Sequence, residues 1–193
     1  MASIVEIANS ALNQLGASTI LSLTENSKNG RLCNARYESI KDSVLRSHPW
    51  NCAIKRVALA SDTAVPAWGF TKQYTIPNDC LRVLQIQNYN HDYKIEGRKI
   101  VSDDTSINLI YVASITDPNE MDILLRETIS AALAADIAYG VTANATFSRE
   151  MAARYEMKIK EARFVDSTEG YNTDPTIGPT DQVISDDFLT SRF

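Results

Sequence analysis

The sequence predicts an α+β protein: an antiparallel four-helix bundle interrupted by a small all-β insertion, with an extended C-terminal tail. Segments with apolar residues spaced three and four apart lie before residue 50 and after residue 117, which is typical of amphipathic helices. Between them, residues 51–116 contain short β-forming runs separated by turn residues. After residue 165 the helical period is lost. The expected domains are therefore 1–50 together with 117–165, then 51–116, and then 166–193.

The first helix is expected to begin near Ser3, because Ser3 and Glu6 have the S-x-x-E spacing of a capping box. Apolar residues recur on one face as far as Leu15, and Gly16 is a typical helix stop. A second helix is expected over residues 31–47. These two helices form the first half of the predicted bundle.

The stretch HPWNCA, residues 48–53, must end the second helix. Proline has no backbone N–H, and it disfavours the helical conformation in the residue before it. We therefore expect Pro49 and Trp50 to have a structural role, with the large indole filling the seam between the bundle and the β insertion.

The β insertion is expected to contain strands within the runs RVALA, FTKQYTI, CLRVLQI, YKIEGRKIV and INLIYVA. The run IEGRKI has the pattern of a hairpin turned at Gly97. Trp68 and Phe70 are expected to pack inside this unit, and a contact with a partner is the alternative.

The third helix is expected over residues 118–141, because Asp117-Pro118-Asn119-Glu120 is a second capping box with proline at the first helical position. It is rich in alanine and apolar on most faces, so it should be buried. The fourth helix is expected over residues 147–164.

Asp136 lies in the apolar arc of the third helix. A buried carboxylate without a partner is costly, so it should form an ion pair or a hydrogen bond. We predict a buried ion pair with Arg36, which flanks the apolar stripe of the second helix.

The charge of the chain is concentrated at its C-terminus. Residues 166–193 hold six of the 24 acidic residues and one of the 19 basic ones, so the rest of the chain holds 18 of each. A neutral body argues against a protein that reads nucleic-acid sequence, which normally has a basic face. The tail nevertheless carries spaced apolar residues, and we expect Ile184, Phe188, Leu189 and Phe193 to be anchors that bind a partner.

The sequence offers little that would support catalysis. His48 and Cys52 are four residues apart, but Pro49 breaks the helix that would align them as a dyad. There are two histidines, His48 and His91, and the three cysteines are widely spaced, so we expect reduced thiols, no disulfide and no metal site. The phosphate-loop, dinucleotide and nucleophile-elbow motifs are absent from the sequence. We predict no catalytic residue and no cofactor, hence no enzyme, and the chain has no apolar run long enough to span a membrane.

Four stretches of the chain, in this order, resemble the tail tubular protein A family, the head-to-tail adaptor or gatekeeper proteins of short-tailed bacteriophages. They are IANSALNQLGASTILSLTENS (7–27), YESIKDSVLRSHPW (37–50), WGFTKQYTIPNDCLRVLQI (68–86) and INLIYVASITDPNEMDILLRETISAALAADIAYGVT (107–142). The likeness spans residues 3–165, and the tail from Asp166 matches only in character, since it is acidic, low in predicted regular structure and carries apolar anchors.

The resemblance implies a structural virion protein. It implies a homo-oligomeric ring of twelve subunits beneath the portal protein, which extends the DNA channel toward the tail and the nozzle (tail tubular B-like) protein. It also implies non-specific contact with passing DNA, no membrane contact, synthesis in the bacterial host cytoplasm and a final place at the head–tail interface of the virion. The tail anchors would bind the portal or a neighbouring subunit.

Two alternatives belong to other classes. A virion-associated small hydrolase should have a concave site with convergent titratable groups. A stand-alone helical protein-interaction module should bury its tail on itself.

Overall fold

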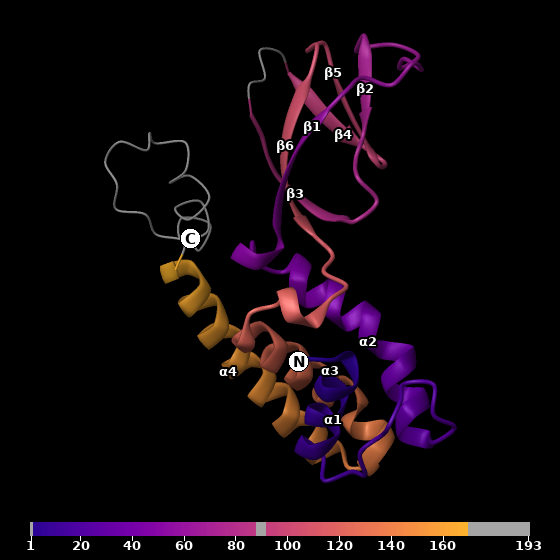
Figure 1. The fold of residues 1–193 in the computed structure, drawn as a ribbon, viewed down its shortest axis with the longest axis vertical. Coiled ribbons are helices and arrows are strands. Elements are labelled where there is room, and N and C mark those ends of the chain that lie inside the picture. Colours follow the sequence, from indigo (N-terminus) through magenta and orange to yellow (C-terminus); the bar gives the residue numbers. More distant parts are fainter. Residues whose placement is uncertain (1, 88–91, 170–193) are drawn as a thin grey trace. The chain divides into compact units, whose positions relative to one another are not determined.

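The computed structural model describes residues 2–87 and 92–169 (Figure 1). The chain divides into two compact units, with breaks at Ala53 and Ser114. The helical unit is formed by the two outer parts of the chain, and the strand unit by residues 53–114.

The first two helices are α1 (Ile4–Gln14) and α2 (Lys28–Arg46). The capping box forms as predicted, because Ser3 Oγ accepts from the Glu6 N–H and the Glu6 carboxylate accepts from the Ser3 N–H. Gly16 follows α1 with φ +65°, a conformation that favours glycine. Helix α2 begins earlier than expected, since the side chain of Ser27 caps it by accepting from the Gly30 N–H.

The predicted capping box at Asp117 does not begin the third long helix. Residues Pro118–Glu120 form a separate short 3-10 helix, η2, because Met121 is buried in an extended conformation with ψ 140° and interrupts the helix there. Helix α3 (Ile123–Thr142) then begins at a second cap, where the Asp122 carboxylate accepts from the Leu124 N–H.

Helix α4 (Ala145–Glu169) is longer at both ends than predicted. At its start the Asn144 side chain accepts from the N–H groups of Thr146 and Phe147. At its end the helix continues past residue 165, because Asp166 is buried and hydrogen-bonded. The predicted boundary between helix and tail at residue 166 is therefore wrong.

The predicted fold class, a four-helix bundle with a small β insertion, is also wrong. In the described residues, four α-helices are accompanied by two three-stranded antiparallel sheets. Helices α1, α2 and α4 pack mainly against α3 (Figure 1) rather than around a shared central core. The reason lies in α3, which buries Leu125, Ile129 and Leu133 together with Ala131 and Ala134, so that it offers apolar surface to neighbours on several sides.

The strand unit begins at Ala53, the last residue of the short 3-10 helix η1 (Asn51–Ala53), and contains two sheets. The first has the order β1-β6-β3 and the second the order β2-β5-β4. The strands are β1 (Ile54–Leu59), β2 (Lys72–Thr75), β3 (Cys80–Gln87), β4 (Tyr93–Glu96), β5 (Lys99–Ser102) and β6 (Ile107–Ala113).

Both sheets contribute to one core. Tyr74 and Ile100 from the second sheet pack with Ile86, Leu109 and Tyr111 from the first. The hairpin between β4 and β5 turns at Gly97 with φ +61°, as the sequence predicts. This segment is a folded unit with its own core, which explains why it is not a minor insertion into a helical bundle.

Candidate functional site

The stretch after α2 reverses the chain and places a large aromatic side chain against the end of that helix. Ser47 is the C-cap, and Trp50 is almost fully buried. The indole Nε1–H donates to the carbonyl oxygen of Val44 at 3.0 Å, and the His48 ring meets the indole edge-on with centroids 4.8 Å apart. The same carbonyl also accepts from the Ser47 N–H at 3.2 Å and from the Ser47 hydroxyl at 2.7 Å, so the indole adds a third donor at the C-terminus of α2.

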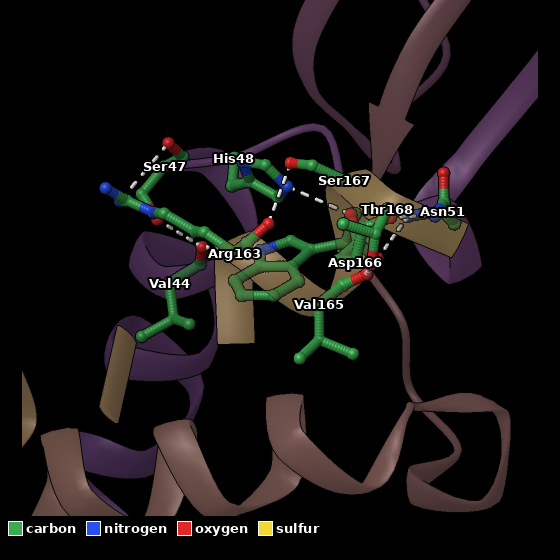
Figure 2. A network of polar contacts seen from close by, with 10 residues as sticks. Val44, Ser47, His48, Asn51, Arg163, Val165, Asp166, Ser167 and Thr168 are labelled. Carbon is green, nitrogen blue, oxygen red and sulfur yellow. Dashed lines mark hydrogen bonds and ion pairs between the residues drawn. The ribbon is translucent and has the colours of Figure 1, made fainter. Parts of the chain in front are cut away.

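Asp166, in the last turn of α4, lies at the centre of a polar cluster (Figure 2). One carboxylate oxygen lies 2.9 Å from His48 Nε2, and the other accepts from the backbone N–H of Asn51 at 3.0 Å. The Asn51 side chain returns a hydrogen bond to the Asp166 carbonyl at 2.7 Å. We call His48, Asn51 and Asp166 the helix-end cluster.

The helix-end cluster fixes the last turn of α4 to the segment that follows α2. His48 and Asp166 are both buried, so their hydrogen bonds are shielded from water. Arg163 adds a longer contact from Nη2 to the Ser47 carbonyl at 3.4 Å. Glu169, the last residue that the structure describes, therefore lies three positions after a fixed point of the helical unit.

A histidine paired with an aspartate is also the orienting half of a hydrolytic triad. Here the side chain of His48 is only 4% exposed and is therefore closed to a substrate. Desolvation raises the pKa of the Cys52 thiol, so this sulfur is mostly protonated at neutral pH and is a poor nucleophile. The arrangement is suited to holding two segments together rather than to chemistry.

Arg36 and Asp136 are brought together by α2 and α3. The guanidinium donates twice to the carboxylate, from Nε at 2.7 Å and from Nη2 at 2.9 Å. The side chains are 48% and 33% exposed, so the pair is not buried as we expected. The long arginine side chain reaches the carboxylate at the margin of the apolar contact between the helices, where solvent still has access.

The structure places the other predicted residues as follows. Trp50 lies within the helical unit, where it is buried beside Val44, and nothing in the structure bears on its predicted role at a seam. Trp68 is 88% exposed, so the expectation that it packs inside the strand unit is wrong, whereas Phe70 is partly buried. His91 and the tail anchors Ile184, Phe188, Leu189 and Phe193 lie outside the described residues.

Asp166 and Asn51 are the functional residues that the sequence reasoning missed. By sequence, Asp166 is assigned to the tail, because it is acidic and precedes a polar segment. Its spacing contained a signal, because Ile159, Ala162 and Asp166 continue one buried stripe of α4. An acid at such a position predicts a hydrogen-bonding or ionic partner, as it does for Asp136.

The helical unit also has an open hollow of about 660 Å³ between α1, α3 and α4. Its lining is polar and includes Glu6, Asn13, Gln14, Glu127 and Arg154. Over residues 2–87 and 92–169, no group of His, Cys, Asp and Glu side chains is arranged to hold a metal ion. Within the same ranges, none of the helices has the length and apolar character needed to span a bilayer.

We compared the chain with models of protein families and with curated protein sequences, and neither comparison found a match.

Proposed function

We propose that the protein is a structural head-to-tail adaptor of a short-tailed bacteriophage. In this proposal its subunits form a ring of twelve below the portal protein, extend the DNA channel and join it to the tail nozzle protein. The observation that carries the proposal is the ordered set of four stretches that resemble the tail tubular protein A family. These stretches contribute the α1–α2 connection, the end of α2, strands β2 and β3, and the passage from β6 into α3.

The C-terminal segment is the proposed attachment to the portal or to a neighbouring subunit. Its proposed anchors are Ile184, Phe188, Leu189 and Phe193, the spaced apolar residues near the C-terminus of an otherwise polar segment. The helix-end cluster supports this role, because a segment that leaves from a fixed point loses less entropy on binding than one that leaves from a frayed helix.

The charge distribution is compatible with a channel through which DNA slides. The basic residues Arg31, Arg36, Lys41 and Arg46 recur every five positions of α2 and do not form one stripe. Two of them are already paired, Arg36 with Asp136 and Lys41 with Glu38. We propose only weak, non-specific contact with DNA. In this proposal the protein is made in the host cytoplasm and is located at the head–tail interface of the virion.

The test is electron microscopy of the protein mixed with the portal ring of the same phage. One sample contains the full chain and a second contains a chain ending at Glu169, which keeps the helix-end cluster and every contact described above. A cut at Val165 would remove Asp166 and so confuse loss of the tail with damage to the fold.

We expect the full chain to add a twelve-fold ring to the portal and the shortened chain to add none. A full-length variant with Ile184, Phe188, Leu189 and Phe193 changed to alanine should behave like the shortened chain. The matched control, with Thr173, Thr176 and Thr180 changed to alanine, should bind normally. Failure of the full chain to bind the portal would overturn the adaptor proposal, and binding by the shortened chain would remove the tail from it.

A further inference from the structure

The connection between β1 and β2 exposes an apolar segment to solvent. Residues 64–70, AVPAWGF, contain no charged side chain, and we call them the apolar loop. Trp68 is 88% exposed and Val65 is 65% exposed. Soluble proteins seldom expose large apolar side chains together unless they form a contact with another molecule.

The apolar loop is held at both ends. Before it, the Asp62 N–H donates to the Gln73 carbonyl at 2.8 Å, and the Asp62 carboxylate accepts from Lys99 Nζ at 2.5 Å. After it, Thr71 donates from its backbone N–H and from its hydroxyl to Asp103 at 2.7 and 2.8 Å. A side chain presented on such a frame can bind with little further ordering.

The same unit contains a pocket at the first sheet, formed by residues of β1, β6 and β3. It has a volume of about 220 Å³ and is lined by Arg56, Val57 and Ala58 of β1, Asn108, Leu109 and Ile110 of β6, and Gln87 of β3. Successive residues of a strand point to opposite faces, and Leu109 belongs to the core of the unit. Asn108 and Ile110 therefore point away from that core. We call this hollow the strand pocket.

The lining of the strand pocket matches an indole. The exposed Ala58 offers apolar contact, the exposed Arg56 guanidinium can stack on an aromatic face, and the amide oxygens of Gln87 and Asn108 can accept from the indole N–H. A cavity of about 150 Å³ accommodates benzene, so the volume suffices for a larger ring.

The same face of the sheet also carries an acceptor in need of a donor. Gln85 pairs in register with Ile110, next to the strand pocket. Its amide oxygen is buried and has no hydrogen-bond partner among the residues that the structure describes. This oxygen is closed to solvent, so an N–H group from a second molecule reaches it only when the Gln85 side chain turns outward on binding.

We propose that Trp68 of one copy of the chain binds in the strand pocket of a second copy. The exposure of Trp68 shows that it does not occupy the pocket of its own chain. Because one surface meets a different surface, the contact is heterologous, and such contacts generate rings or filaments. The inference deepens the proposed function by naming an interface within the ring, but it can be tested without the portal.

The first test is sedimentation of the full chain at concentrations up to about 1 mM, where an association of only about −4 kcal/mol is detectable. We expect the wild type to self-associate. Trp68→Ala and the pocket-filling variant Ala58→Gln should each weaken association at least about tenfold. Leu21→Ala, which removes an exposed leucine of the helical unit, is the matched control and should leave association unchanged. All three positions are exposed, and circular dichroism verifies that the variants fold.

The second test mixes the two defective variants. The Trp68→Ala chain keeps its strand pocket and the Ala58→Gln chain keeps its indole, so the mixture should form dimers that grow no further. Acrylamide quenching of tryptophan fluorescence should fall on mixing, since Trp50 is buried throughout and only Trp68 changes its environment. A monomeric wild type, or variants that associate like it, would overturn the interface. Either result would leave the portal-binding test independent, because that test depends on the C-terminal anchors.

Discussion

Tyr37 on α2 is a buried side chain whose polar atom is poorly accommodated. Its hydroxyl has no hydrogen-bond partner among the residues that the structure describes. Burial of an unsatisfied hydroxyl opposes folding. Tyr37→Phe should therefore raise the free energy of unfolding by about 1 kcal/mol, as measured by urea denaturation.

Tyr74 provides the matched comparison for Tyr37. It is equally buried, but its hydroxyl donates to the Asp104 carbonyl at 2.5 Å. Tyr74→Phe removes a hydrogen bond that is made, so it should lower the free energy of unfolding by about 1 kcal/mol. Equal effects of the two substitutions would contradict the explanation based on hydrogen-bond satisfaction.

At the scale of the element, the end of α4 depends on the helix-end cluster. In Asp166→Asn, an amide NH₂ replaces one carboxylate oxygen. It meets the Asn51 N–H as a second donor, or it faces His48 Nε2 and requires the histidine to change tautomer in a buried place. We expect amides 163–169 to exchange with solvent about ten to one hundred times faster, which corresponds to about 1–3 kcal/mol of local stability. Hydrogen exchange measured by mass spectrometry provides the test.

Glu169→Gln is the control for Asp166→Asn. It makes the same chemical change in the same helical turn, but Glu169 is exposed. If both variants exchanged at the same rate, the loss of negative charge rather than the loss of the buried contact would be responsible.

At the scale of the whole molecule, acidic pH should destabilise the folded state partly through Asp62. Hydrogen bonds from Lys99 and then Thr75 lower the pKa of this carboxyl below its usual 3.8. A carboxyl group whose pKa is lower in the folded state than in the unfolded state stabilises the folded state at pH values above its pKa in the unfolded state. The stabilisation is lost as the pH falls below about 3.8 and then through the lower pKa that Asp62 has in the folded state.

Alkaline pH should also destabilise the folded state, through the buried tyrosines. Desolvation raises the pKa of Tyr37 from 10 to about 12. Desolvation together with the charge of Asp79 raises the pKa of Tyr111 from 10 to about 12. These phenols therefore ionise at a lower pH in the unfolded state than in the folded state. The contribution of these phenols to the free energy of unfolding is fully present below pH 10. It declines by about 2 or 3 kcal/mol per phenol as the pH rises to 12.

Urea denaturation from pH 2.5 to 12 tests both statements together. Asp62→Asn should flatten only the acidic limb of the stability profile, and Tyr37→Phe should flatten only the alkaline limb. An Asp62→Asn profile that ran parallel to the wild type at low pH would rule out a role for this carboxyl in acid stability.

The sequence by itself determined the features that depend on neighbouring residues. The capping box of Ser3 and Glu6, the stop at Gly16, the end of α2 before Pro49 and the hairpin at Gly97 all form as predicted. Each depends on backbone geometry within a few residues, which the local residue types dictate.

The pairing of Arg36 with Asp136 could also be anticipated, because a carboxylate within an apolar arc requires a partner. The exposure of this ion pair could not be anticipated, since exposure depends on how closely α2 and α3 approach each other. The same limit applies to the start of α3, where burial of Met121 overrides a good local capping box.

Only the tertiary structure decided which helix is central, how the strands divide into two sheets and which side chains remain outside the cores. Asp166 is recruited into α4 by His48 and Asn51, which lie more than one hundred residues away in the sequence. Trp68 is exposed although it is large and aromatic, because β2 and β5 complete the core of the strand unit without it. Burial is a property of the packed whole, whereas caps and turns are properties of a few consecutive residues.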